Sequence, residues 1–526
     1  MDILGEHFIL RNVMVSDSRT INTVRNILWG NIGNFIALLL QFVSRTIFIY
    51  TIGITYLGVN GLFINILGVL SFAELGIGTA MNYSLFKPMA DRDYEKIKSL
   101  MSLYKKAHWL IAFVITVCGL ILMPFLHYIA KVGADIKHLH IYYIVFLFNS
   151  VTSYFVTYKY SMVYVEQKNY ILTNIDSTAR CIITVIQAIS LLVFKSFLVY
   201  LLIQSIVQLV QRLYTLKYIN KRYPYLLEKK VQPLDRDEKK IIIDNVKALM
   251  IHKLGAISAY QTDSIIISTF INITVVGLIS NYYLLISSVT TILSVVFNSF
   301  VSSLGNFITT ESKIKQHELF DVYHFLGFWL FGFTTICFIV LTQPFIALWI
   351  GTDKQIDNIS VLLIIMNQYL LGQRITTVNF KTAAGVYKED QFLSILHVVV
   401  NVPVNILLIK IMGLPGLYLG ALIVGLMSNI WRPVIVYRVI FNAKATSYFV
   451  DSVKYLVVTL ITALLLVVLS KYNMIENRIV HFVLNLVITA IIPNIVFYFI
   501  FRNSNEFNYL RVKVFTLIKL SVKHAV

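Results

Sequence analysis

Long apolar segments, each close to 20 residues and separated by charged or polar stretches, recur along the whole sequence. A helix rises about 1.5 Å per residue, so roughly 20 residues cross a hydrocarbon core about 30 Å thick. The chain is 57% hydrophobic and only 13% charged, whereas roughly 25% is usual in a soluble domain. In a bilayer the backbone must be hydrogen-bonded within its own segment or in a closed barrel, and continuous apolar runs select helices. We therefore predict an all-α integral membrane protein.

Fourteen such segments predict fourteen transmembrane helices. Two pseudo-symmetric six-helix bundles are expected at residues 1–216 and 248–440, joined by a charged cytoplasmic linker at 217–247. Two further helices and a cytoplasmic tail would occupy residues 441–526. The polar N-terminal residues lack the apolar core and cleavage site of a signal peptide, so the first span is expected to be retained. The predicted spans are 27–50, 58–82, 107–129, 139–157, 171–193, 196–213, 248–270, 275–304, 323–346, 358–380, 392–411, 414–436, 455–470 and 479–501.

The distribution of Lys and Arg predicts the orientation of the chain, because these residues concentrate in short cytoplasmic loops. With the N-terminus inside, only a few of the 45 Lys and Arg fall in external loops. Both termini are therefore expected in the cytoplasm. The same bias explains the net charge of +19, so no nucleic-acid partner is predicted. The external cations are Lys131, Lys137, Lys195, Lys354, Lys410, Lys471 and Arg478.

The sequence has no pattern typical of a cofactor, metal or catalytic site. Its three cysteines lie singly inside apolar segments, without a second Cys or His at metal-ligand spacing. There is no nucleophile elbow and no phosphate-binding Walker loop. We expect no enzymatic activity and no metal.

An internal repeat is indicated when the sequence is offset by 216 residues. This offset places Arg45 in the first span close to the position of Asp263 in the seventh. The two halves would then present opposite charges to a shared cavity. The identities at this offset pair Thr46, Gly61, Leu62 and Asn65 with Thr262, Gly277, Leu278 and Asn281.

Polar stripes run along three predicted spans. A charge in mid-membrane costs about 2.5–3.5 kcal/mol, so it should face protein or water. One face of the first span carries Asn31, Asn34, Gln41 and Arg45. One face of the tenth span carries Asn367, Arg374, Thr377 and Lys381. The polar residues of the seventh span are Lys253, Tyr260 and Asp263. Glu74 and Arg180 are further deep charges.

These stripes favour a water-filled cationic cavity that binds an anion. Arg45, Arg374 and Lys381 could hold a diphosphate, since a guanidinium binds phosphate oxygens in bidentate fashion. Asp263 and Glu74 are candidates for proton or Na⁺ coupling. The alternative interpretation is that each charge is paired with a neighbour and fixes helix packing. The other candidate substrate-binding residues are Gln41, Asn34, Lys253 and Arg180.

The first two spans resemble a known family at residues 44–46 (SRT), 56–63 (YLGVNGLF) and 72–78 (FAELGIG). They look like the Wzx-type polysaccharide-biosynthesis flippases of the multidrug/oligosaccharidyl-lipid/polysaccharide exporter superfamily. The resemblance implies a bacterial cytoplasmic-membrane protein with a MATE-like fold. It also implies alternating-access transfer of undecaprenyl-diphosphate-linked oligosaccharide to the outer leaflet, for capsule or O-antigen, alongside glycosyltransferases and a polysaccharide polymerase. Arg45 and Asp263 match positions where the family places cavity charges.

Two rival functions are weaker on sequence grounds. A cation-coupled multidrug and toxin extruder of the same fold would favour an acidic cavity for its cationic substrates. A membrane polymerase or ligase would place catalytic residues on a sizeable external loop, and the predicted external loops are short.

Overall fold

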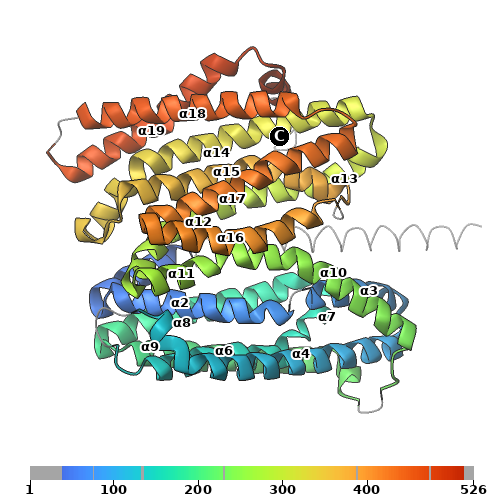
Figure 1. The fold of residues 1–526 in the computed structure, drawn as a ribbon. Helices are drawn as coiled ribbons and strands as arrows, with labels where there is room; N and C mark the ends of the chain where they lie inside the picture. The colour runs from blue at the N-terminus through green and yellow to red at the C-terminus, as the bar shows by residue number, and fades with distance from the viewer. Residues whose placement is uncertain are drawn as a thin grey trace, which may run out of the picture. The chain divides into compact units, whose positions relative to one another are not determined.

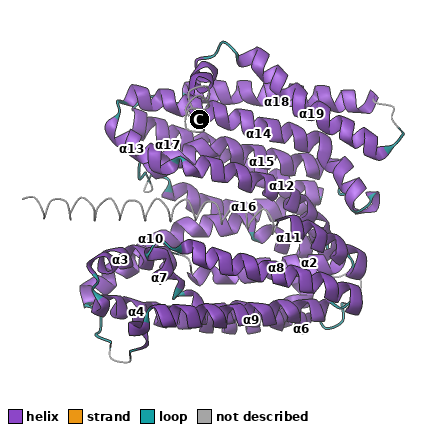
Figure 2. Cartoon of the chain, turned by 180° about the vertical axis from the view of Figure 1, so that it is seen from behind, coloured by secondary structure: helices purple, strands orange, loops and turns teal. Residues whose placement is uncertain are grey.

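The computed structural model describes residues 38–74, 76–131, 136–228, 231–386, 389–472 and 476–513. These residues form helices joined by short turns, and no strand occurs among them. In Figure 1 the long helices within each part of the chain run roughly parallel to one another, and Figure 2 shows only helix and loop. The predicted all-α fold is confirmed.

Thirteen of the fourteen predicted spans overlap one helix or a run of consecutive helices, and the described part of the first span, residues 38–50, lies in the helix Leu38–Ile52. Ten described helices are long and apolar enough to cross a membrane, which makes the chain a multi-pass membrane protein. The first, second, seventh and tenth predicted spans fall short of this criterion because they are broken, partly described or more polar. These four spans carry most of the predicted intramembrane charges.

The chain divides into two compact units, Met1–Gly277 (unit 1) and Leu278–Val526 (unit 2). Unit 1 contains the helix Leu38–Ile52, α2 (Ile54–Leu70), η1 (Ser71–Glu74), α3 (Ile77–Asp91), α4 (Tyr94–Leu122), η2 (Met123–Phe125), α5 (Leu126–Ile129), α6 (Leu139–Thr157), α7 (Tyr160–Val165), α8 (Asn169–Phe194), α9 (Phe197–Arg222), η3 (Pro224–Leu227), α10 (Arg236–Tyr260), α11 (Thr262–Phe270) and the start of α12 (Ile273–Ser299). Unit 2 contains the rest of α12, α13 (Val301–Thr310), α14 (Lys313–Trp349), η4 (Thr352–Lys354), α15 (Asn358–Ala383), α16 (Gln391–Met412), α17 (Leu414–Val436), the π-helical turn η5 (Tyr437–Phe441), α18 (Thr446–Tyr472) and α19 (Arg478–Phe501).

The packing boundary lies after α11 because α10 and α11 pack on the helices of unit 1. α10 contacts α3, and α11 contacts α2. The Asn65 side chain on α2 donates a hydrogen bond to Ser264 on α11 at 3.0 Å. The predicted domain limits at 216, 247 and 440 stay predictions.

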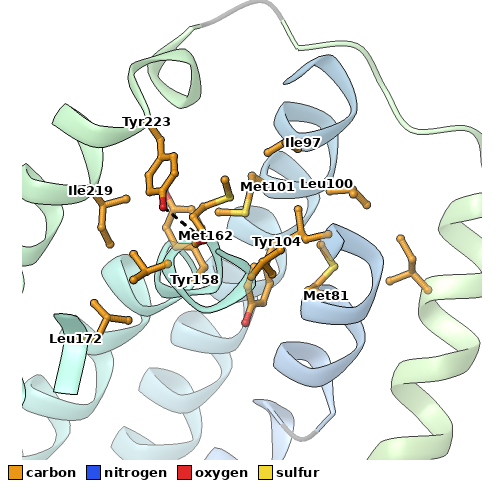
Figure 3. Packing of buried hydrophobic residues seen from close by; sticks show 14 residues of the cluster. Met81, Ile97, Leu100, Met101, Tyr104, Tyr158, Met162, Leu172, Ile219 and Tyr223 are labelled. Carbon is orange, nitrogen blue, oxygen red and sulfur yellow. Dashed lines mark hydrogen bonds between the residues drawn. The ribbon is translucent and has the colours of Figure 1, made fainter. Parts of the chain in front are cut away.

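A buried apolar cluster joins α3, α4, α7, α8, α9 and α10 at one end of unit 1. Figure 3 shows Met162 of α7 at its centre, beside Tyr158, Met101 and Tyr223. Met162 and the next residue, Val163, have no exposed surface. This burial fixes α7, a helix too short to be stable alone, and leaves its opposite face for other contacts.

In unit 2 the long helix α14 contacts α15, α18 and α19. Its aromatic side chains form the core with the last two helices. The Phe328 ring stacks on Tyr455 of α18 with ring centroids 4.2 Å apart, and the centroid of the Phe497 ring of α19 lies 4.8 Å from that of Phe328. Aromatic pairs of this kind add about 0.5–1.5 kcal/mol to area burial. The two C-terminal helices are therefore built into the core of unit 2.

Candidate functional site

Arg45 lies half-buried on the helix Leu38–Ile52, on the side that packs against α9. It interacts electrostatically with Tyr200 of α9. One turn later, Phe48 packs edge-on against the same Tyr200, with ring centroids 5.0 Å apart. Gln41, one turn before Arg45, is exposed. Asn31 and Asn34, the other members of the predicted stripe, lie outside the described residues.

Glu74 lies where the second predicted span is interrupted. It ends the 3₁₀ turn η1, and Gly76 then takes a left-handed conformation with φ of 86° before α3 begins. A side chain at Gly76 would be strained there. Tyr154 of α6 interacts electrostatically with the Glu74 carboxylate. Broken spans of this kind mark ion and substrate sites in transporters, so the predicted role of Glu74 has a suitable local structure.

The seventh predicted span is also broken, at Gln261 between α10 and α11. Asp263 is buried, 7% exposed, in the first turn of α11. A carboxylate in this position is stabilised by the positive end of the helix dipole. The side chain of Lys253 lies outside the described residues.

Arg180 on α8 is exposed and interacts electrostatically with Asp176, which lies one turn earlier on the same helix. The Asp176 carboxylate also accepts a hydrogen bond from Gln211 of α9 at 2.7 Å. Asp176 was not among the residues predicted from sequence. The signal available was its spacing of four from Arg180, which puts both on one helical face.

In unit 2, Asp390 is the centre of a charged cluster formed by α15, α16 and α17. Its side chain is 1% exposed, precedes α16, and forms ion pairs with Lys381 of α15 and Arg432 of α17. The Arg432 Nε donates to Asp390 Oδ1 at 3.0 Å. Lys381 was predicted from its heptad spacing to Arg374. Asp390 and Arg432 were missed because only the tertiary structure brings them together.

Arg374, two turns before Lys381 on α15, interacts electrostatically with His397 of α16 and with Tyr448 of α18. His397 in turn hydrogen-bonds Ser428 of α17 at 2.5 Å and interacts with Arg432 and Asp390. We call Arg374, Lys381, Asp390, His397 and Arg432 the unit 2 charge cluster. It contains two arginines, one lysine, one histidine and one aspartate.

Not every polar residue of the predicted α15 stripe belongs to this cluster. The Asn367 amide donates to the Tyr418 carbonyl oxygen of α17 at 2.9 Å. This contact ties α15 to α17 and is the polar helix packing that was the alternative interpretation. The stripe thus combines a packing residue with residues of the charge cluster.

The chemistry of the unit 2 charge cluster suits anion binding. It brings the guanidinium groups of Arg374 and Arg432 and the ammonium group of Lys381 together with one carboxylate, Asp390. Cations in or beside membrane helices are expensive in lipid and persist where they face water, protein or an anionic ligand. The two guanidinium groups offer the planar donor geometry that phosphate oxygens prefer. Among the described residues, no group of three or more His, Cys, Asp or Glu is arranged to hold a metal ion.

No known protein family matches the sequence, and no curated protein sequence matches it either. Solved structures do match the fold. The lipid II flippase MurJ, in an inward closed conformation, is 15% identical with a TM-score of 0.64, and the match covers 91% of this chain and 99% of MurJ. The MATE multidrug transporter DinF-BH is 16% identical with a TM-score of 0.56, covering 81% and 97%. A mutant of the Vibrio cholerae MATE transporter VcmN is 15% identical with a TM-score of 0.53, covering 80% and 98%. The chain thus has the fold that MurJ and the MATE transporters share.

Proposed function

We propose that this protein is a flippase for a lipid-linked saccharide, an undecaprenyl-diphosphate-linked oligosaccharide, which it moves from the inner to the outer leaflet of the bacterial cytoplasmic membrane. The observation that carries the proposal is that two arginines, Arg374 and Arg432, gather around His397 in the unit 2 charge cluster. The cargo pairs a diphosphate, which needs cations, with a lipid tail that can remain in the bilayer. The likeness to a lipid II flippase over nearly the whole chain supports the same class of cargo.

The proposed mechanism is alternating access, without bond making or breaking. Arg374 and Arg432 of unit 2 bind the diphosphate, and Arg45 is proposed as a separate anion contact in unit 1. Glu74 and Asp263 are proposed to take up the coupling proton or Na⁺, because each lies at a break in a span. Both termini are cytoplasmic in this proposal, and glycosyltransferases and a polymerase act before and after the flippase.

The proposal is tested with the purified full-length protein in liposomes carrying a fluorescent undecaprenyl-diphosphate saccharide. We expect wild-type protein to expose the labelled headgroup on the opposite leaflet, and Arg374→Gln and Arg432→Gln to slow this at least about tenfold, since each removes a charge-assisted contact of about 1.5–3 kcal/mol. The control is Arg438→Gln, which makes the same change at an exposed position in η5. Wild-type rates in both cluster variants would rule out the site.

Cation-coupled multidrug efflux is the second candidate function, because the MATE transporters share the fold. Organic cations would be repelled by the unit 2 charge cluster. Uptake of a fluorescent organic cation into the same liposomes separates the two functions. Transport of the dye without transfer of the lipid-linked saccharide would establish efflux instead.

A further inference from the structure

A polar hollow of about 230 Å³ lies on unit 1 between α3, α7 and α8. Its walls differ in chemistry from the unit 2 charge cluster, because no Lys or Arg is among the described residues that line it. Of these residues only Leu172 is aliphatic; Asp176 supplies a carboxylate, and the others carry amides, hydroxyls or phenols. The lining residues are Asn82, Tyr160, Ser161, Tyr164, Asn169, Leu172, Thr173 and Asp176.

The short helix α7 presents this polar wall because its other face is buried. Met162 and Val163 lie in the apolar cluster of Figure 3, and Tyr160 and Tyr164, one turn apart, line the hollow. Tyr164 is 48% exposed, so its ring offers an apolar face next to the hydrogen-bonding groups.

The hydrogen-bonding groups of the hollow are held in place by neighbouring helices. Gln211 of α9 donates to Asp176 Oδ1 at 2.7 Å, and the Tyr160 phenol interacts electrostatically with the same carboxylate. Asn82 differs from these groups. Its Oδ1 is buried and accepts no hydrogen bond from the described residues, and a buried acceptor of this kind is normally paired in a native protein. A donor supplied by a bound molecule would satisfy it.

We propose that this hollow binds one sugar ring of the cargo, an inference that rests on the proposed function for the identity of the cargo. A sugar hydroxyl donates one hydrogen bond and accepts others. The amides of Asn82 and Asn169 can donate to such a hydroxyl, and the Asp176 carboxylate can accept from it. The carboxylate and the absence of cations among the described lining residues disfavour a diphosphate. Drug-sized ligands need roughly 300–1,000 Å³, so the volume suits a single ring, and it far exceeds what one small ion fills.

The test uses the full-length protein in lipid nanodiscs, without any detergent that has a sugar headgroup. Saturation-transfer NMR is recorded with glucose, galactose, mannose, rhamnose and N-acetylglucosamine as separate probes. We expect at least one of these sugars to bind. Asp176→Asn keeps an acceptor for Gln211 while removing the charge, and Asn82→Ala removes the unpaired acceptor. Each should weaken binding about three- to tenfold, the range expected for one hydrogen bond.

The matched control is Asn149→Ala. Asn149 is also a partly buried amide of unit 1, and its Oδ1 likewise accepts no hydrogen bond from the described residues. Its Nδ2 donates to Ser205 on α9, and it does not line the hollow. Sugar binding that Asn149→Ala leaves unchanged and Asp176→Asn weakens supports the proposal, even if Asn82→Ala fails to fold. Absence of binding for every sugar, or equal binding in wild type and Asp176→Asn, would overturn it. So would ²³Na⁺ binding that requires Asp176 while no sugar binds, because the hollow would then be a cation site.

This measurement separates the inference from the proposed function. Sugar binding that depends on Asp176, in a protein that fails to transfer the lipid-linked saccharide, upholds the sugar site and rejects the flippase. Transfer that depends on Arg374, in a protein whose hollow binds no sugar, upholds the flippase and rejects the sugar site.

Discussion

The backbones of Gly58 on α2 and Gly277 on α12 lie in direct contact. A Cβ on Gly277 would lie 2.2 Å from the Ile54 carbonyl oxygen, and a Cβ on Gly58 would lie 2.0 Å from the Ile273 carbonyl oxygen. The Thr55 and Thr274 hydroxyls hydrogen-bond beside this crossing, at 3.1 Å. Small residues that allow two backbones to meet are a main means of helix association in membranes, where lipid offers no hydrophobic driving force.

We expect Gly58→Ala to destabilise the protein by about 1–3 kcal/mol, because the added methyl group meets a backbone atom that cannot rotate away. Gly61→Ala on the same helix is the control, since its Cβ would lie 3.6 Å from a Val276 methyl group, an ordinary contact. The measurement is thermal unfolding in detergent. Gly58→Ala should have a clearly lower Tm than Gly61→Ala. Equal Tm values would mean that α2 and α12 can move apart at this crossing without loss of stability.

Asp390→Asn should be strongly destabilising. It leaves Lys381 and Arg432 without their shared carboxylate, and breaking a buried ion pair costs about 3–5 kcal/mol. Adding Lys381→Met should recover part of that loss, because removing both charges of a buried pair is often nearly neutral. Thermal unfolding of the single and double variants gives the coupling free energy.

The control for this experiment is Asp353→Asn. Asp353 also pairs with a lysine, Lys354, but its side chain is 71% exposed, and exposed pairs contribute only about 0–1 kcal/mol. An equally small loss of stability in Asp390→Asn and Asp353→Asn would show that bulk water reaches the unit 2 charge cluster. The ion pairs of Asp390 would then contribute no more to stability than an exposed pair.

The sequence predicts the positions of the membrane helices well because segment length and hydropathy are local properties. Charge pairing depends on packing and is harder to predict. The spacing of Arg374 and Lys381 indicates one helical face, and the structure brings both to α16. Nothing in the sequence indicates that Asp390, in the turn before α16, closes onto Lys381 and Arg432. Hydropathy predicts continuous spans across the breaks near Glu74 and at Gln261, because it does not detect an interruption of the helix.

The linker between the predicted bundles should be held to unit 1 by ion pairs. Lys98 of α4, whose side chain is 5% exposed, pairs with Glu228 at 2.7 Å and with Glu95 at 2.6 Å. The Ser99 hydroxyl donates to the Gln232 carbonyl oxygen at 2.6 Å. Lys98 is shielded from solvent, whereas the side chains of Glu95 and Glu228 are 58% and 56% exposed, so salt should weaken these pairs in part.

We therefore expect Glu228→Gln to speed hydrogen exchange of the backbone around Gln232 by about fivefold, the factor for roughly 1 kcal/mol. The control is Asp244→Asn on α10, which removes an exposed pair with Lys247 at 3.8 Å. Mass spectrometry of the exchanged peptides provides the measurement. Unchanged exchange in Glu228→Gln would show that backbone contacts alone hold the linker.

Glu166, in the turn between α7 and α8, should make stability depend on pH. Burial alone would raise the pKa of this carboxyl, but hydrogen bonds from Arg222 and Lys168 outweigh it and hold the pKa below its usual value. Arg222 Nη2 donates at 2.7 Å and Lys168 Nζ at 3.0 Å. The pKa of Glu166 is thus lower in the folded state than in the unfolded state, where it is about 4.3. The ionised carboxylate therefore stabilises the fold at pH values above about 4.3, and this stabilisation is lost as the pH falls through the folded-state pKa.

Glu166→Gln should accordingly lower the Tm at neutral pH and have a progressively smaller effect as the pH falls below about 4. The side chains are partly exposed, 23% for Glu166 and 32% for Arg222, so the contribution at neutral pH should not exceed about 1 kcal/mol. In an Arg222→Met background most of this pH dependence should disappear, since the main donor is gone. A pH profile of Glu166→Gln that stayed parallel to the wild-type profile throughout would show that the carboxylate is not stabilised by its two cations.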